Sequence, residues 1–371
     1  MLVIVEQSYK ITGWCREIVE GLRAEARKKR INLAIGTNFN DISEGEHTEG
    51  AVMIVGSDID WLRSAVDAAK RKSLHPIVLS NQSERSLGGG VSCVTEDLFE
   101  SMRAICRHFE SRGARHLALY AHNPQSASDA CRKQAFLECG GEDEDVFVNR
   151  GSLESCFESF VEKHTKNPYN AIVCVNDFAA LSLIRHMNKA GQSLDGIELI
   201  SYSNTLLSEC STPAVSTVVT NYESFGQLAF MILDCVGKTD AINGMHMLAK
   251  WTIRHRDTSK SLDFSPQTVV YSEKQPSESE FYRDPEINEM MRIEKLLSEC
   301  DDVDLDILKM ILEGKKTAEI ELCCYLTPTA LKYRIRKMKD TCAVTSRAEL
   351  YNFVSKHITS AKSLNNLYKR I

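Results

Sequence analysis

The sequence has no long apolar run, because no stretch of 18 consecutive apolar residues occurs among its 371 residues. We therefore expect no transmembrane helix, which needs about 20 such residues. Internal repeats and low-complexity segments are also missing, and the 43% hydrophobic and 26% charged residues are ordinary for a folded protein. The length corresponds to two or three domains with sizeable cores, rather than to a disordered chain.

Ordered cysteine patterns are missing as well. The 13 cysteines are an odd number and show neither Cys-x-x-Cys nor Cys/His ligand spacing, and adjacent Cys323 and Cys324 lie in an apolar helical pattern. This excludes the usual signatures of a secreted disulfide framework and of a zinc site. The chain starts with apolar residues 2–5, without the basic lead of a signal peptide. We expect a cytoplasmic protein with free thiols.

Signatures of enzymes are absent too. The sequence contains no nucleophile elbow, P-loop or Gly-x-Gly-x-x-Gly motif. The glycines at 88–90 precede neither a lysine nor a helical pattern, and we interpret them as a flexible turn. We expect no catalytic residue, no metal and no cofactor, so an enzyme is the last of three hypotheses.

Short apolar segments alternate with longer amphipathic ones up to about residue 235. This alternation is typical of parallel sheets covered by helices on both faces. More than 200 residues of it exceed one small doubly wound sheet, so we predict two α/β lobes with a ligand at the C-terminal ends of their strands. The expected strands are residues 2–6, 31–36, 51–56, 76–79, 116–120, 171–175 and 198–202. The expected helices are residues 12–29, 59–70, 97–112, 126–139, 152–166, 177–190 and 222–236.

The pattern changes between residues 257 and 302. Residues 263–266 and 275–280 contain Pro, Ser and acidic residues and indicate a linker. Pro285 then begins a predicted helix that ends near residue 300. One apolar stripe at 3-4-3 spacing runs along it: Met290, Ile293, Leu297 and Cys300. This helix either docks against a neighbouring domain or forms a dimer contact.

The last segment differs from the rest in charge. Residues 303–371 hold 13 Lys and Arg against 7 Asp and Glu, a net charge of +6, whereas the remaining residues hold 32 against 44, a net charge of −12. The basic segment predicts short helices at 304–312, 317–325, 328–340 and 347–357, with Thr327 as N-cap and Pro328 at the first position of the third. Two helices joined by a short turn indicate a helix-turn-helix unit.

The helix after Thr327 has a cationic outer face, since Leu331, Ile335 and Met338 form its inward stripe. One α-helix fits the major groove of B-DNA, and its first turns reach the base edges. Thr317 opens the preceding helix, whose N-terminus suits a phosphate. The predicted DNA-binding residues are Thr317, Thr327, Thr329, Lys332, Tyr333, Arg334, Arg336 and Lys337. A solvated basic face is the alternative interpretation of this charge.

Residues 311–327 resemble the LuxR-type helix-turn-helix pattern without a gap. The shared features are the Gly314 turn, Glu319-Ile320, and Leu331-Lys332 where the family has Val-Lys. Residues 344–350 match its Val-x-Ser-Arg-x-Glu-Leu ending. The chain departs from the pattern at Glu321, where the family prefers Ala, and at Cys324, where it prefers Leu. A fully buried carboxylate at position 321 would be costly.

Two landmarks in the body place polar groups near a ligand. Strand 171–175 runs into Asn176 and Asp177, although Asp177 alternatively only caps the next helix. Arg132, early in the helix after strand 116–120, either faces the cleft or forms a surface ion pair. Together with residues 112–119 and 213–218, these landmarks resemble the sensor domain of LacI/GalR-type regulators, which is similar to periplasmic sugar-binding proteins.

The resemblance spans about residues 1–256 and implies a ligand between the lobes. The ligand-binding residues that we expect are Gln7, Ser8, Tyr9, Ser128, Arg132, Asn176, Asp177, Ser203, Asn204 and Thr220. Ser203 stands where the family often has an Asp, and a neutral hydroxyl makes no charge-assisted bond to a sugar hydroxyl. Residues 37–50 are short and acidic where the family has a full helix, and the helix-turn-helix follows the sensor instead of preceding it.

The sequence as a whole predicts a ligand-responsive one-component transcriptional regulator. We expect a two-lobed sensor at 1–256, a linker and connector helix at 257–302, and a LuxR-type helix-turn-helix domain at 303–371. The expected partners are double-stranded DNA, a sugar-like small-molecule effector and a second copy in a homodimer, without a membrane. The alternative is a cytoplasmic small-molecule binding protein without DNA-binding function.

Overall fold

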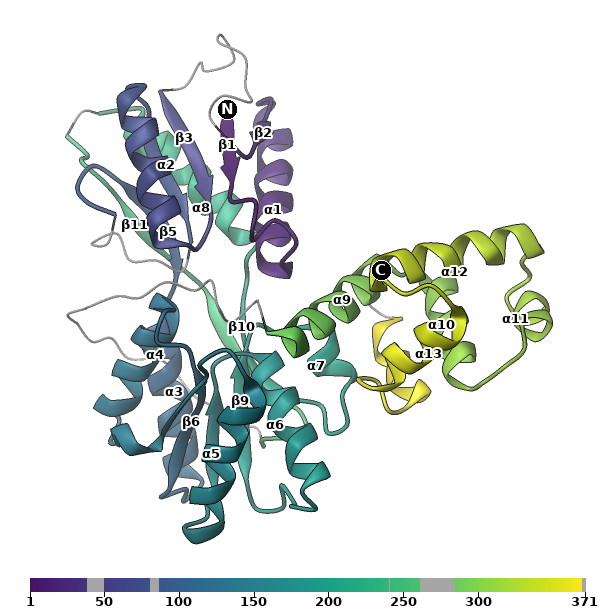
Figure 1. Cartoon of the computed structure of the whole chain (residues 1–371). Coiled ribbons are helices and arrows are strands. Elements are labelled where there is room, and N and C mark those ends of the chain that lie inside the picture. The colour runs from purple at the N-terminus through teal and green to yellow at the C-terminus, as the bar shows by residue number, and fades with distance from the viewer. Residues whose placement is uncertain (39–49, 81–86, 240, 261–283, 369–371) are drawn as a thin grey trace.

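Two six-stranded sheets organise the body of the chain, as a computed structural model shows for residues 1–38, 50–80, 87–239, 241–260 and 284–368. The predicted linker segments 263–266 and 275–280 lie outside the described residues, as does most of the acidic segment 37–50. The first sheet and its helices form lobe 1, the second sheet and its helices form lobe 2, and the C-terminal helices extend to one side of both (Figure 1). The predicted architecture, two α/β lobes with largely parallel sheets followed by a helical unit, is confirmed.

Lobe 1 has an all-parallel sheet in the order β11-β5-β4-β3-β1-β2. Its strands are β1 (Leu2–Val5), β2 (Ala34–Gly36), β3 (Ala51–Val55), β4 (His75–Leu79), β5 (Ser92–Glu96) and β11 (His246–Ala249). Helices α1 (Gly13–Lys29) and α8 (Ser224–Val236) cover one face, and α2 (Ile59–Arg71) covers the other. Because side chains alternate along a strand, Val3 packs towards α1 and α8, while Ile4 packs towards α2.

Lobe 2 has the order β12-β10-β9-β8-β6-β7, parallel except for the antiparallel pair β10–β12. Its strands are β6 (Leu117–His122), β7 (Val146–Val148), β8 (Ala171–Cys174), β9 (Glu198–Tyr202), β10 (Ser216–Thr220) and β12 (Trp251–Arg254). Its helices are α3 (Leu98–Ser111), α4 (Ala127–Glu138), α5 (Leu153–Lys166), α6 (Asp177–Lys189) and the short α7 (Leu206–Cys210), with a 3-10 turn at Asp143–Asp145. The chain crosses between the lobes after β5, after β10 and between β11 and β12.

All seven predicted strands and all seven predicted body helices are present, most with ends shifted by one or two residues. The sequence did not predict β5, β7, β10, β11, β12 or α7. Three of these strands, β7, β11 and β12, lie at sheet edges, and β12 alternates half-buried with exposed residues. Strand β10 is rich in Ser and Thr, yet most of it is buried. Short, edge or hydroxyl-rich strands lack the continuous apolar signal on which the prediction depends.

The C-terminal part consists of helices. They are α9 (Pro285–Glu299), α10 (Asp302–Leu312), α11 (Thr317–Cys323), α12 (Pro328–Cys342), α13 (Arg347–Ser355) and the 3-10 helix η5 (Ala361–Leu367). Helix α9 buries its apolar stripe and packs against both α7 of lobe 2 and α12. The structure thus shows α9 docked against a neighbouring domain, which was one of its two interpretations. Glu321 and Cys324 are both half-buried. The free-energy cost of a fully buried carboxylate therefore does not apply to Glu321.

Two further expectations were free cysteine thiols and the absence of a transmembrane helix. All 13 cysteines lie within the described residues and are free thiols. Within the described residues, no helix combines the length and the apolar character needed to cross a bilayer.

Candidate functional site

A pocket lies between the lobes, where the C-terminal ends of their parallel strands face each other. It contains about 650 Å³ of free space, open solvent included. That size suits a small molecule. The lining residues are Trp14, Ile18, Ser57, Ser80, Glu96, Asn123, Ser126, Ser128, Asp129, Arg132, Val175, Asn176, Ser203, Tyr222 and Phe225.

The lobe 1 side of the pocket is aromatic and carries one carboxylate. The ring centres of Trp14, at the start of α1, and Tyr222 lie 6.4 Å apart, and Phe225 in the first turn of α8 completes this wall. Glu96 ends β5 and accepts a 2.7 Å hydrogen bond from the Tyr222 hydroxyl. Aromatic rings offer flat apolar faces, and a carboxylate accepts strong hydrogen bonds from hydroxyl groups.

The lobe 2 side of the pocket is built around Arg132 of α4, which is 7% exposed. Its Nη1 donates a 2.7 Å hydrogen bond to Asp129, and its guanidinium lies 4.3 Å from the ring centre of Tyr202. Burial opposes the charge of Arg132, yet its pKa is raised, because the Asp129 carboxylate stabilises the cation. Arg132 Nε and Asn123 Nδ2 are buried and have no hydrogen-bond partner among the residues that the structure describes. Both therefore offer donors to a ligand oxygen.

Two more pocket residues come from strand ends of lobe 2. Asn176 follows β8 closely, and its side chain accepts a 2.9 Å hydrogen bond from Ala179 N, so that it caps α6. Ser203 follows β9 with a φ of 106°, a value that is uncommon for a residue other than glycine. The pocket thus unites four predicted ligand-binding residues: Ser128, Arg132, Asn176 and Ser203. Their contact with a ligand stays a prediction.

Asp177 lies outside the pocket, which corrects its expected role. Asn176 is the helix cap, and the Asp177 carboxylate is fully buried under the strand ends. It accepts hydrogen bonds from Thr205 N at 2.6 Å and Ser208 Oγ at 2.7 Å. It also accepts hydrogen bonds from the hydroxyl groups of Ser201, Thr205 and Thr217. Burial raises the pKa of Asp177, although these donors favour the charged form.

Five other predicted ligand-binding residues also lie outside the pocket lining: Gln7, Ser8, Tyr9, Asn204 and Thr220. In the first loop, Gln7 and Ser8 are exposed, while Tyr9 is buried beside Trp14. Trp14, and not these loop residues, lines the pocket. The side chain of Asn204 accepts a 2.7 Å hydrogen bond from Arg256 Nη2. Thr220 Oγ1 lies 3.3 Å from Glu96 Oε2 and supports a lining residue from behind.

The prediction missed several lining residues of lobe 1 and the crossovers, above all Trp14, Glu96, Tyr222 and Phe225. Each stands at a crossover or at a helix start, and residues 14, 96 and 222 meet only because the chain passes between the lobes repeatedly. No local motif marks such residues. The only signal was compositional, namely an aromatic residue or a carboxylate directly after a predicted strand or before a helix.

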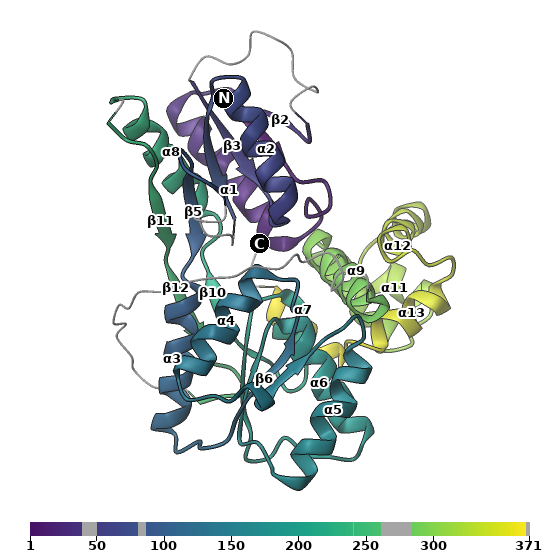
Figure 2. The same ribbon diagram turned by 60° about the vertical axis from the view of Figure 1, so that its left-hand side comes forward.

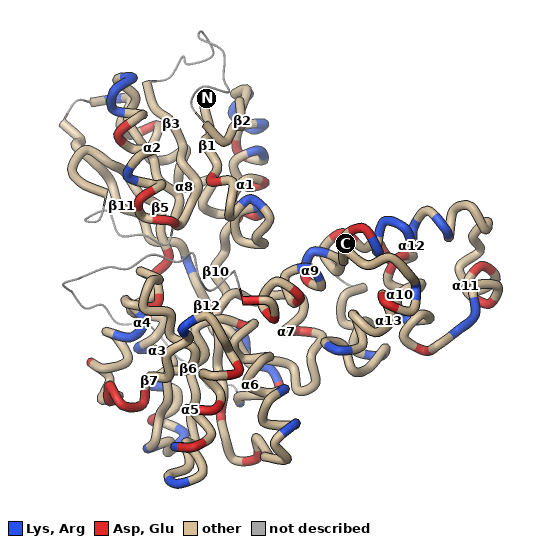
Figure 3. Tube along the Cα trace, in the orientation of Figure 1, with Lys and Arg blue, Asp and Glu red and all other residues tan. Residues whose placement is uncertain are grey.

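A second candidate site is the outer face of α12. Thr327 caps this helix by accepting a hydrogen bond from Ala330 N at 3.2 Å, as predicted. Leu331 and Met338 are buried, and Ile335 is half-buried. The exposed side of α12 therefore carries Thr329, Lys332, Tyr333, Arg336 and Lys337. Figure 3 shows the Lys and Arg positions gathered along α12.

Arg334, Thr317 and Lys337, three of the predicted DNA-binding residues, form hydrogen bonds with other segments of the C-terminal part, that of Lys337 Nζ being to the carbonyl of Glu299 at 3.4 Å. Arg334 Nη1 donates to both carboxylate oxygens of Asp301, at 2.9 Å each, and to Asp304 at 2.7 Å, so it ties α12 to the start of α10. Thr317 Oγ1 accepts a 2.9 Å hydrogen bond from Arg347 Nη1, and Lys316, not Thr317, is the N-cap of α11. Arg334 is thus half-buried between α12 and α10, and its contact with DNA stays a prediction.

Comparison with known proteins supports the two-lobed fold. Residues 106–259 match the model of the periplasmic binding protein-like domain. The chain is 20% identical over 260 residues to catabolite control protein A of Staphylococcus xylosus, covering 66% of this chain and 77% of that protein. The same protein of Staphylococcus aureus strain Mu50 is 22% identical over 259 residues, with the same coverage.

Solved structures show the same fold. The LacI family transcriptional regulator CCPA from Weissella paramesenteroides with bound sucrose aligns with a TM-score of 0.56 and 19% identity, over 71% of this chain and 98% of that one. The complex of the transcriptional regulator CelR with cellobiose aligns with a TM-score of 0.55 and 16% identity, over 70% and 83%. At this identity, the likeness establishes the fold of the lobes.

Proposed function

We propose that the chain is a ligand-responsive one-component transcriptional regulator that acts in the cytoplasm as a homodimer. In this proposal, a sugar-like effector binds between the lobes, and the α11–α12 unit is a LuxR-type helix-turn-helix that binds specific double-stranded DNA. The observation that carries the proposal is the pairing, in one chain, of an inter-lobe polar pocket with an exposed basic helix on an otherwise acidic molecule. Support comes from the similar proteins: a catabolite control protein, the regulator CelR in complex with cellobiose, and a LacI family transcriptional regulator with bound sucrose.

The composition of the pocket favours an uncharged, hydroxyl-rich ligand. Among the described residues, its lining contains two carboxylates, Glu96 and Asp129, against one cation, Arg132. A further carboxylate, that of Glu6, accepts a 2.8 Å hydrogen bond from the backbone N–H of the lining residue Ser57. A phosphate would thus enter a site of net negative charge, which is unfavourable. Hydroxyl groups, by contrast, can both accept from Arg132 and Asn123 and donate to Glu96.

A thermal-shift series tests the ligand. The probes are cellobiose, sucrose, glucose and ribose, with glucose 6-phosphate as the charged counterpart. We expect at least one neutral sugar to raise the melting temperature with dose, since a ligand at 100 times its Kd stabilises by about 2.7 kcal/mol. Trp14→Leu should abolish the shift, whereas Trp251→Leu, outside the lining, should retain it. No shift with any neutral sugar, or a shift confined to the phosphate, would contradict a sugar-like neutral effector.

Selection from a pool of random 30-base-pair duplexes tests DNA binding by the full chain. We expect the wild type to enrich a sequence motif and the double variant Lys332→Ala/Arg336→Ala to enrich none. The control is Arg23→Ala/Lys28→Ala, which removes the same charge from exposed positions on α1 and should select the wild-type motif. Sugar binding without any enrichment would favour the alternative, a small-molecule binding protein without DNA-binding function.

A further inference from the structure

Lobe 2 and the C-terminal helices share one apolar core. This core runs from Phe160 and Ile200 of lobe 2, through Met290 and Ile293 of α9, to Leu331 of α12. Lobe 1 instead has separate cores on the two faces of its own sheet. Closely packed interiors resist deformation and move as units. The basic helix α12 therefore travels with lobe 2, and any ligand-driven closure moves lobe 1 against this combined body.

Polar contacts fix α9 to lobe 2 along most of its length. Asp284, the N-cap of α9, accepts a 3.1 Å hydrogen bond from Leu153 N of α5, and Glu286 forms an ion pair with Arg185 of α6. The Glu294 carboxylate then accepts hydrogen bonds from the backbone N–H groups of residues 206 and 207, at 2.9 and 2.8 Å. These N–H groups open α7, which starts three residues after the pocket residue at 203.

Lobe 1 reaches α9 near its other end. Arg16 Nη1 of α1 donates a 2.9 Å hydrogen bond to Ser298 Oγ, and Arg16 lies two residues after Trp14 of the pocket. Figures 1 and 2 both place α9 beside the level at which the lobes meet. The same end of α9 holds α12, because Thr341 Oγ1 donates to Glu299 Oε2 at 3.1 Å. Two turns earlier, Arg292 Nη1 donates to the carbonyl of residue 342 at 2.9 Å.

We propose that α9 is the coupling element of this chain and that Arg16 is the residue by which lobe 1 acts on it. Lobe 2 holds α9 through Glu294, and the position of lobe 1 sets the Arg16–Ser298 contact. A ligand that draws Trp14 towards Ser203 displaces Arg16 and changes its contact with Ser298, and thereby alters how firmly the junction of α9 and α12 is held and where lobe 1 lies relative to α12. Only a contact that differs between two lobe arrangements transmits a ligand signal, and this contact joins the two moving bodies. The inference rests on the proposed function and names the regulation of that pocket.

Hydrogen–deuterium exchange of the full, ligand-free chain is the first test, and it needs neither sugar nor DNA. Arg16→Ala should speed amide exchange at least threefold in residues 292–299 and in the adjoining C-terminal half of α12. Arg23→Ala is the matched control, since Arg23 lies two turns further along α1 and pairs with Glu20. Equal exchange in both variants and the wild type would overturn the coupling role of Arg16.

The second test measures the coupling itself as the ratio of DNA Kd values with and without the sugar that shifts the melting temperature of the wild type. In Arg16→Ala, this ratio should fall to about 1 while the sugar still raises the melting temperature; Arg23→Ala should keep the wild-type ratio. Glu294→Gln, which still accepts a hydrogen bond, should keep most of the ratio, and Glu294→Ala should lose it. A wild-type ratio in Arg16→Ala would overturn the proposal.

The two tests separate failure of this inference from failure of the proposed function. If the wild type binds neither sugar nor DNA, the proposed function is wrong, and the exchange experiment still decides whether Arg16 controls α9. If the wild type binds both but Arg16→Ala changes neither exchange nor the ratio, only the coupling inference is wrong.

Discussion

At the scale of single residues, Asp177 was expected to contact a ligand, but its buried carboxylate accepts hydrogen bonds that join elements of lobe 2. Asp177 joins three elements of lobe 2, since its partners lie in or beside β9, α7 and β10. The sequence placed it correctly at a strand end but gave no sign that Ser and Thr from three later segments converge on it. Long-range hydroxyl partners leave no periodic pattern. Asn176, its neighbour, is the residue that faces the pocket.

Removal of the Asp177 carboxylate should destabilise lobe 2. In Asp177→Ala, the N–H of Thr205 and the surrounding hydroxyls lose their acceptor in a buried site, so we expect a loss of about 2–4 kcal/mol. Urea unfolding of the full chain measures it, with Asp195→Ala at an exposed position as the control, expected within about 0.5 kcal/mol of wild type. Equal stability of the two variants would contradict the role assigned to Asp177.

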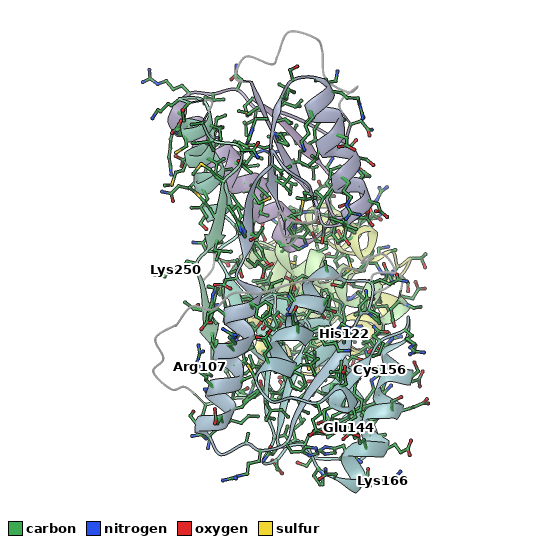
Figure 4. The ribbon with its side chains drawn as sticks, turned by 90° about the vertical axis from the view of Figure 1, so that its left-hand side faces the viewer. Arg107, His122, Glu144, Cys156, Lys166 and Lys250 are labelled. Atoms are coloured by element: carbon green, nitrogen blue, oxygen red, sulfur yellow. The ribbon has the colours of Figure 1, made fainter. Side chains whose placement is uncertain are left out.

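His122 should make stability fall in acid. It ends β6 in lobe 2 (Figure 4). It is 5% exposed, and burial lowers its pKa to about 4. The unfolded chain, with a histidine pKa near 6.5, then binds more protons between pH 6.5 and 4. The contribution of His122 is complete above pH 6.5 and is lost as the pH falls, by about 2 kcal/mol at pH 5.

Urea unfolding at pH 7 and pH 5 checks this sign. His122→Gln should lose about 2 kcal/mol less than the wild type on acidification, because the glutamine does not titrate. His75→Gln serves as a comparison, since burial also lowers the pKa of that half-buried histidine, in lobe 1. An identical loss in the wild type and His122→Gln would rule out His122 as a source of acid sensitivity.

At the scale of elements, predictability followed the strength of the local signal. The amphipathic helices and the buried central strands were predicted because each carries its own periodicity. Strand β12, half-buried and at an edge, and α7, only five residues long, carry too few periods to be recognised. The pocket was predicted from its lobe 2 strand ends, whereas its aromatic wall arises from the crossovers, which no segment encodes alone.

The closest helix contact of lobe 1 depends on two glycines. A Cβ atom built at Gly226 of α8 would lie 2.2 Å from the carbonyl carbon of Gly21 of α1. Gly226→Ala should therefore separate α1 from α8 and cost about 1–3 kcal/mol. Gly13→Ala on α1 is the control, because nothing lies within 4 Å of a Cβ there and the substitution should be neutral or slightly stabilising. Urea unfolding compares them, and a neutral Gly226→Ala would show that the helices adjust without cost.

At the scale of the whole molecule, charge and packing divide the chain differently. By charge, the basic segment 303–371, at +6, opposes a remainder at −12. By packing, the same segment belongs to lobe 2, with which it shares a core. An acidic body joined to a basic helix would favour approach of DNA from the α12 side, since the net charge of the body repels phosphates. Under the proposed function, long-range charge would orient the encounter with DNA, and the lobe arrangement would set the position of α12 relative to lobe 1.

The salt dependence of DNA affinity is the quantitative consequence of this charge division. The logarithm of the binding constant should fall linearly with the logarithm of the salt concentration, with a slope of about −0.9 per phosphate contacted. Lys332→Ala/Arg336→Ala should weaken binding and make the slope shallower by up to about 2, if each residue contacts one phosphate. Arg334→Ala should weaken binding through lost stability of the α10–α12 contact and should leave the slope of the folded protein unchanged.

Fluorescence anisotropy with the selected duplex between 50 and about 300 mM salt measures the slopes of the wild type, the double variant and Arg334→Ala. A slope that changes with Arg334 but not with Lys332 and Arg336 would mean that DNA contacts a different face of α12 from the one that the structure exposes.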